Sequence, residues 1–92
     1  MNRILKYYLE PEGITKITDP VVRVLSVGNQ RNEIAAWALV DDYDVSYNRT
    51  LELVTIGTGW KMEEEWFQEW FFVGTIVTDS FVWHAWGRYI ED

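Results

Sequence analysis

His84 is the only histidine in this 92-residue chain, and it is the side chain best suited to move a proton near neutral pH. It follows Trp83 directly, so in a strand one of these two side chains points inward and the other outward. No nucleophile is placed by its spacing to pair with His84, and a zinc site would need several further ligands. We therefore expect a structural or weak binding role for His84, and the sequence predicts no catalytic residue, metal site or cofactor.

Gly57-Thr58-Gly59 is the second segment that could do chemistry, because the backbone N–H groups of a glycine-rich loop can cradle an anion. Trp60 and Lys61 follow it, so it lacks the Gly-Lys-Ser/Thr of a phosphate-binding loop. The third glycine of a dinucleotide-binding fingerprint is also missing. A tight turn at the end of a strand is the favoured interpretation.

The composition indicates a folded, acidic domain. The hydrophobic fraction is 48%, which is normal for a globular domain, and the net charge is −7, which opposes direct nucleic-acid binding. The chain has no cysteine, so disulfides and cysteine metal sites are excluded. No apolar run approaches the roughly 18 residues of a membrane helix, and the start of the chain does not read as a secretory signal. We expect a cytoplasmic location, no membrane contact and a possible homo-oligomer, since small domains gain stability by association.

Short alternating or β-branched runs, separated by turn residues, indicate an all-β fold. The predicted strands are Arg3–Leu9, Ile14–Thr18, Val21–Val27, Glu33–Val40, Thr50–Ile56, Phe71–Val77 and Phe81–Trp86. We expect a single β-rich domain over residues 1–92, built as a small antiparallel sandwich or partly open barrel of roughly six strands. Consecutive strands are expected to pair as antiparallel hairpins.

Two of these strands carry signals about packing. Ala36 and Ala38 share one face, opposite Trp37 and Leu39, and small residues on a face predict that another layer packs closely there. Gly74 interrupts its strand, which predicts a β-bulge or the close approach of another backbone.

A short helical or loop insertion is expected near residues 62–70. Met62, Trp66 and Trp70 are spaced four apart and would share one helix face, while Glu63–Glu65 would occupy the first turn, where the helix dipole favours negative charge. The rings either plug an open end of the β fold or form a protein-binding surface, because tryptophan anchors among charges are typical of interface hot spots. The predicted partner-binding residues are Trp60, Glu63, Glu64, Glu65, Trp66, Phe67 and Trp70.

Six short segments, in order along nearly the whole chain, resemble a widespread family of small tailed-bacteriophage proteins of unassigned function. They are Lys6–Pro11, Val24–Val27, Trp37–Asp41, Gly57–Gly59, Val73–Ile76 and Phe81–His84. The chain departs from the family pattern at Trp60, where members usually carry histidine, and in the longer acidic aromatic segment that follows. The resemblance implies a phage origin and no chemistry, and it marks residues 62–70 as a specialised addition.

Phage accessory proteins frequently act against host defence, which gives two functional hypotheses. In the first, an acidic, tryptophan-rich surface binds and inhibits a host defence protein in the host cytoplasm. In the second, an oligomeric sponge sequesters a nucleotide immune signal by ring stacking and basic contacts. The sponge would bind its ligand through Trp83, His84, Trp86 and Arg88, with Arg23 and Arg49 as further cations. The net charge of −7 favours the first hypothesis because it repels an anionic ligand, and no enzymatic activity is expected.

Overall fold

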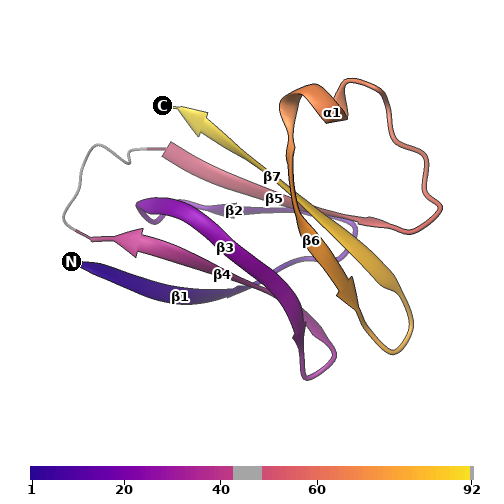
Figure 1. Ribbon diagram of the computed structural model, residues 1–92, viewed down its shortest axis with the longest axis horizontal. Helices are drawn as coiled ribbons and strands as arrows, with labels where there is room; N and C mark the ends of the chain where they lie inside the picture. Colours follow the sequence, from indigo (N-terminus) through magenta and orange to yellow (C-terminus); the bar gives the residue numbers. More distant parts are fainter. Residues whose placement is uncertain (43–48, 92) are drawn as a thin grey trace.

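The computed structural model describes residues 1–42 and 49–91, which form two antiparallel sheets packed as a small β-sandwich (Figure 1). One sheet contains, in spatial order, β1 (Asn2–Tyr8), β4 (Glu33–Asp41) and β3 (Val21–Gln30). The other contains β2 (Ile14–Ile17), β5 (Arg49–Gly57), β7 (Val82–Glu91) and β6 (Phe71–Val77). A short helix, α1 (Trp66–Glu69), precedes β6. The predicted fold class is confirmed, and the seven strands of the described residues lie on the seven runs predicted from the sequence, close to the rough count of six.

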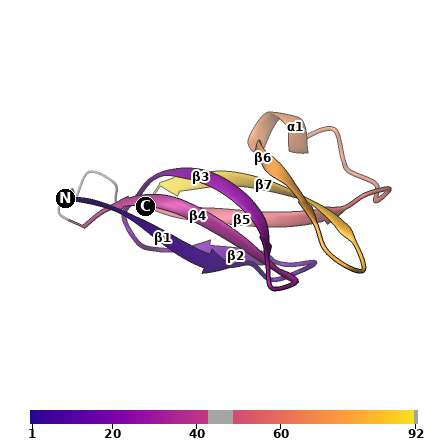
Figure 2. The same ribbon diagram turned by 60° about the horizontal axis from the view of Figure 1, so that its bottom comes forward.

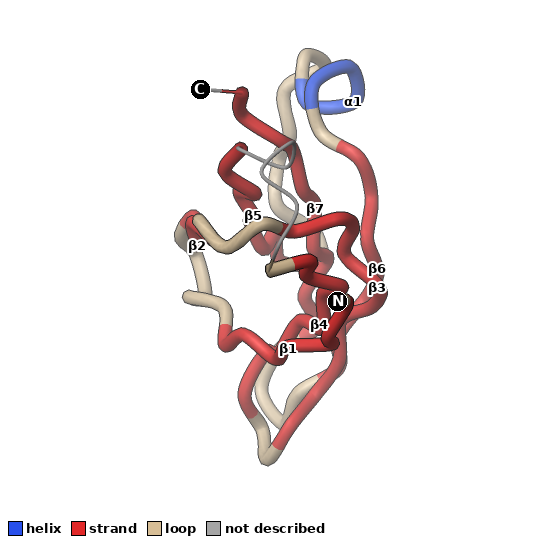
Figure 3. The backbone as a smooth tube through the Cα atoms, turned by 90° about the vertical axis from the view of Figure 1, so that its left-hand side faces the viewer, coloured by secondary structure: helices blue, strands red, loops and turns tan. Residues whose placement is uncertain are grey.

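The sandwich is thin. It measures 40 × 32 × 16 Å along its principal axes, and Figure 2 shows its strands in shallow, twisted layers. β3 of one sheet runs beside β6 of the other (Figure 3). At this contact a Cβ atom on Gly74 would lie 2.9 Å from Cγ2 of Val27, and the β6–β7 ladder shifts register between Phe72 and Gly74. The β-bulge predicted at Gly74 is therefore present, whereas the group that approaches this glycine closely is the side chain of Val27 and not another backbone.

Strand pairing differs from the expected series of hairpins. Among the described strands, β3–β4 and β6–β7 are the pairs that are consecutive in the chain, whereas β1 pairs with β4, β2 with β5 and β5 with β7. β1 and β2 belong to different sheets because the turn over residues 9–13 carries the chain from one layer to the other. Hydrophobic periodicity marks where strands lie, but it does not encode which strand each one pairs with.

Small and aliphatic side chains fill the space between the sheets. Ala36, Ala38 and Ala85 have no exposed area and belong to one core cluster, while Trp37 and Leu39 lie half-buried on the outer face of β4. The largest side chains with less than 2% exposure are Leu51, Leu53, Ile76, Val21, Val40 and Thr55. None of these is aromatic, so the predicted close packing of a second layer on the alanine face is confirmed.

Tyr7 ties β1 to the segment between β2 and β3. Its hydroxyl donates a 2.6 Å hydrogen bond to a carboxylate oxygen of Asp19. Burial of the phenol, followed by that hydrogen bond and the charge of Asp19, raises the pKa of Tyr7 well above its usual range. The phenol therefore keeps the proton that it donates through the neutral and moderately alkaline pH range.

Gly87, at the centre of β7, allows a test of the tight core. A Cβ atom there would lie 2.9 Å from Cζ of Phe71 and 3.1 Å from Cδ2 of Leu53, so Gly87→Ala overpacks the core. We expect the free energy of unfolding, measured in urea, to fall by about 1–3 kcal/mol.

Gly13→Ala is the matched control for this substitution. A Cβ atom at Gly13 meets nothing closer than 3.5 Å, and its backbone does not need a left-handed conformation. This variant should leave the stability unchanged or raise it by up to about 1 kcal/mol, because alanine restricts the unfolded chain. Equal stabilities for the two variants would show that the side chains around Gly87 move aside without cost.

Candidate functional site

The connection between β5 and β6, residues 58–70, carries the predicted partner-binding residues (Figure 1). Its helix is shorter than predicted, because α1 begins at Trp66 and residues 61–63 are not helical. The Trp66 N–H donates to the carbonyl of Glu63 over 3.1 Å, and Trp70 leaves the helix with φ −117° and ψ 141° to begin β6. A helix this short gains little stability from its own hydrogen bonds. The packing of its aromatic rings therefore determines the conformation of its backbone.

Trp60 anchors the start of this connection. Its N–H donates to the carbonyl of Gly57 over 3.1 Å, and its ring meets that of Trp83 edge-on, with 5.5 Å between centroids and 84° between planes. A Cβ atom on Gly57 would lie 2.7 Å from Cε2 of Trp60, so glycine is needed for the indole to fold back over the end of β5. Trp60 remains 42% exposed. The glycine segment is thus a turn, as predicted, and it seats a partly exposed ring.

Trp70 anchors the other end. It is only 7% exposed, with the Arg88 guanidinium 4.3 Å from its ring centroid and the ring of Trp66 stacked on it at 4.8 Å. The Nε of Arg88 lies 2.8 Å from a carboxylate oxygen of buried Glu52, its cross-strand neighbour, and its Nη1 lies 3.4 Å from Glu69. These contacts fasten α1 to the outer face of the four-stranded sheet. Trp70 therefore serves packing, whereas the sequence placed it on a partner surface.

Glu63, Glu64 and Glu65 lie between the two anchors and form what we call the acidic turn. All three residues are exposed, and the carbonyl of Glu65 accepts hydrogen bonds from two N–H groups of the following residues. Within the described part of the chain, no lysine or arginine forms an ion pair with them. The side chain of Phe67, also predicted to bind a partner, lies outside what the structure describes. The acidic turn therefore presents three unneutralised carboxylates from a segment fixed at both ends.

The residues predicted to bind a nucleotide do not converge. Trp83 is buried in the core cluster, whereas His84, Trp86 and Arg88 alternate with the core-facing positions of β7 and lie toward the outer face. Trp86 packs against Phe72, with 5.2 Å between ring centroids. Because Arg88 already serves two carboxylates and a ring, an anionic ligand would have to displace those contacts to reach it.

His84 is engaged at both ring nitrogens. Its Nε2 lies 2.7 Å from the hydroxyl of Thr58 and its Nδ1 lies 3.0 Å from the hydroxyl of Thr75. Each hydroxyl can donate or accept, so both ring nitrogens have a hydrogen-bond partner, in keeping with a structural role. Arg49 donates to two backbone carbonyls of β3, and Arg23 is an exposed residue of that strand. These cations do not gather around the histidine.

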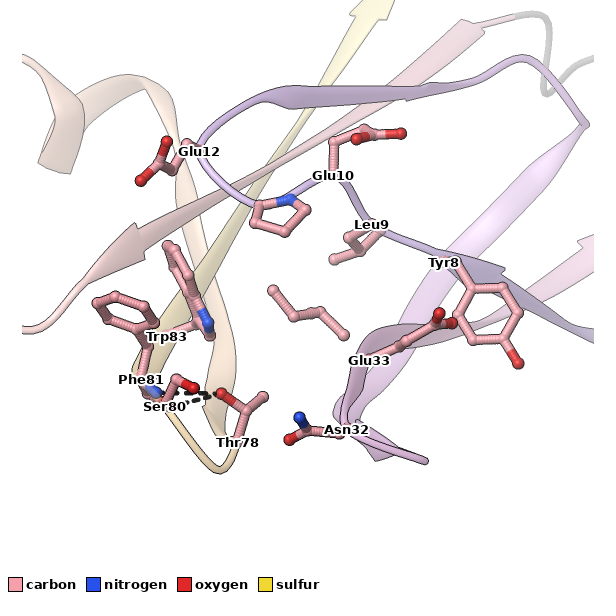
Figure 4. Close-up of a pocket in the computed structure, with 12 residues that line it drawn as sticks. Tyr8, Leu9, Glu10, Glu12, Asn32, Glu33, Thr78, Ser80, Phe81 and Trp83 are labelled. Carbon is pink, nitrogen blue, oxygen red and sulfur yellow. Dashed lines mark hydrogen bonds between the residues drawn. The ribbon is translucent and has the colours of Figure 1, made fainter.

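A groove that the sequence did not reveal opens where three turns meet (Figure 4). It has a volume of about 580 Å³ and lies between the β1–β2 turn, the β3–β4 hairpin and the β6–β7 hairpin. Its buried lining is apolar and consists of Leu9, Ile34 and Trp83, and exposed Phe81 stands beside them. We call this feature the three-turn groove.

Two asparagines bond the hairpins together beside the groove. The Nδ2 of Asn29 donates to the carbonyl of Val77 over 2.8 Å, and the N–H of Asp79 donates to Oδ1 of Asn32 over 2.8 Å. The N–H of Asn32 in turn donates to Oδ1 of Asn29 over 2.7 Å. This asparagine clamp joins hairpins of different sheets, so it fixes the spacing of the turns that border the groove.

A family model described as "Domain of unknown function (DUF7352)" matches residues 1–92. The chain belongs to this family. Comparison of the DUF7352 chain with curated proteins and with solved structures gave no match. No helix in the described residues combines the length and apolar character that crossing a membrane requires.

The features that remain for function in this DUF7352 domain are suited to binding. Among the described residues, no group of three or more histidine, cysteine, aspartate or glutamate side chains is arranged to hold a metal ion. Trp83 connects the two exposed features, because it lines the three-turn groove on one side and contacts Trp60 on the other. Lys61 and Met62 separate Trp60 from the acidic turn, so the contact with Trp83 is made at the start of the connection that carries this turn.

The Glu52–Arg88 pair gives a prediction about how α1 is held in this DUF7352 chain. Glu52→Gln removes the charge that Arg88 faces at 2.8 Å, so we expect the free energy of unfolding in urea to fall by about 1.5 kcal/mol. The value sits at the lower end of the range for charged hydrogen bonds because Arg88 is partly exposed and keeps Glu69.

Glu64→Gln makes the same chemical change at an exposed position and is the control. It should alter stability by less than about 0.5 kcal/mol. For both variants, unfolding in urea is followed by tryptophan fluorescence, which gives the free energy of unfolding. A Glu52→Gln protein as stable as the Glu64→Gln protein would mean that the salt bridge does not hold the connection in place.

Proposed function

We propose that this protein is a non-enzymatic binding protein that occupies a basic surface of a partner protein. The acidic turn and the partly exposed ring of Trp60 would form the contact. The observation that carries the proposal is the presentation of three exposed, unneutralised carboxylates between two anchored tryptophans. The resemblance to phage proteins supports a host defence protein as the partner and the host cytoplasm as the place of action.

Anchoring at both ends favours binding because less conformational freedom is lost on association. Trp60 is held by its contacts with Gly57 and Trp83, and Trp70 is held by Arg88. A fixed, partly exposed indole is the kind of side chain that most often dominates an interface. The carboxylates around it would steer the encounter with a positively charged partner.

The nucleotide sponge receives less support from the geometry. Its four predicted residues lie on two faces of β7, and the two cations that could hold a phosphate near them, Arg88 and Arg49, already have partners. A stacking surface without a converging cation is a weak site for an anion.

The proposal is tested by affinity capture from host lysate, followed by binding measurements with the captured partner. Trp60→Ala should weaken the partner about 30-fold, as expected for a hot-spot tryptophan. The triple variant E63Q/E64Q/E65Q should weaken it about tenfold and flatten the dependence of the association rate on salt.

A second triple variant, D42N/D79N/E91Q, removes the same number of charges elsewhere on the surface and should bind within about twofold of the wild type. Heating the captured material and analysing it by mass spectrometry tests the competing idea. Release of a nucleotide without any captured protein would overturn the proposal in favour of the sponge.

A further inference from the structure

The three-turn groove combines apolar depth with an aromatic edge. Leu9, Ile34 and Trp83, each at most 6% exposed, form its buried lining, while Tyr8 and Phe81 are 50% and 55% exposed. Figure 4 shows Phe81 and Trp83 on one side of the groove and Tyr8 on the other, with Leu9 between them. An apolar side chain entering from solvent would therefore meet rings on both sides.

Three glutamates line the same groove. Glu10 and Glu12 come from the β1–β2 turn, and Glu33 begins β4. All three are exposed, and none forms an ion pair with a lysine or arginine of the described residues. The groove lining contains no lysine, arginine or histidine. Its charge is uniformly negative, so it excludes anionic ligands and attracts a cation.

The backbone around the groove is held in an unusual conformation. The non-glycine residues with positive φ in the described chain are Glu12 at 62°, Arg31 at 53° and Asn32 at 65°. Arg31 and Asn32 form the two-residue turn of the β3–β4 hairpin, and the asparagine clamp supports that turn from the side. Glu12 lies in the β1–β2 turn and lines the groove. The turns that border the groove are thus held in fixed conformations, which reduces the conformational entropy lost when a ligand binds.

We infer that the three-turn groove binds a basic amphipathic segment of a partner protein, in which lysine or arginine alternates with apolar residues. The apolar side chains pack on Leu9, Ile34 and Trp83, and the cationic groups pair with Glu10, Glu12 and Glu33. Charge complementarity selects this occupant over an acidic peptide, a nucleic acid or an anionic membrane. The inference rests on the proposed function, because Trp83, which lines the groove, contacts Trp60, the ring proposed to bind the same partner.

The test uses three short fluorescein-labelled peptides and the intact protein. In the first peptide arginine alternates with leucine, in the second arginine alternates with serine, and in the third glutamate alternates with leucine. Fluorescence anisotropy should show binding of the first, about tenfold weaker binding of the second and no measurable binding of the third. Amide chemical shifts of Leu9, Glu12 and Phe81 should move on addition of the first peptide.

Two triple variants separate site from charge. E10Q/E12Q/E33Q should weaken the arginine–leucine peptide at least about tenfold, since each exposed pair contributes modestly. D19N/D42N/E91Q removes the same charge from exposed positions outside both the groove and the acidic turn, and should weaken that peptide by less than about twofold. Phe81→Ser tests the apolar half of the site and should weaken the arginine–leucine peptide more than the arginine–serine peptide. Unchanged amide spectra away from the substitutions show that each variant is folded.

Equal weakening by the two triple variants would overturn the inference, because it would mean that total charge alone drives binding. Concentration-dependent dimerisation that E10Q/E12Q/E33Q abolishes would also overturn it, since a second copy would then be the occupant. Failure of the inference remains distinct from failure of the proposed function. A groove variant that binds peptide normally sinks the inference alone, whereas an acidic-turn variant that captures the host partner normally sinks the proposed function alone.

Discussion

The narrow spacing between the two sheets is the constraint on which the rest of this structure depends. Alanines on β4 and β7 and the glycine at position 74 let the sheets approach, and none of the largest fully buried side chains is aromatic. Such a core has no room for most of the six tryptophans. Trp83 fits only near the open end, where it lines the groove, and the other rings are displaced to the outer faces or the connecting segment.

The displaced rings explain where this acidic chain can bind. Trp70 finds a second packing layer against Arg88 on the outer face, whereas Trp60 stays partly exposed beside the end of β5. Carboxylates flank the exposed rings at the acidic turn and at the three-turn groove, while Arg88, which holds Trp70, is neutralised by Glu52. The molecule thus separates a stabilising ion pair from carboxylates that stay available to a partner. The narrow spacing between the sheets therefore accounts for both the stable scaffold and the exposed rings that are available for binding.

Local patterns in the sequence predicted local features well. The alternation of Ala36 and Ala38 with larger residues identified the core face of β4, and Gly74 identified the bulge in β6. The helix was predicted too long because the spacing of its rings was interpreted as helical periodicity. The positions of these rings are instead determined by contacts with other parts of the fold. The Glu52–Arg88 pair joins residues 36 apart, and the groove needs β1 to pair with β4. Neither of these long-range contacts produces a periodic pattern in the sequence. The strand pairing and the groove can therefore be recognised only in the folded structure.

The asparagine clamp has a mechanical consequence. Because Asn29 and Asn32 bond the hairpin of one sheet to Val77 and Asp79 in the hairpin of the other sheet, the two hairpins are coupled at their tips. Breathing of either hairpin must break both links, so slow amide exchange in one should be correlated with slow exchange in the other. A ligand bound between the turns would oppose the same opening, so it would also protect amide groups of the two hairpins that it does not touch.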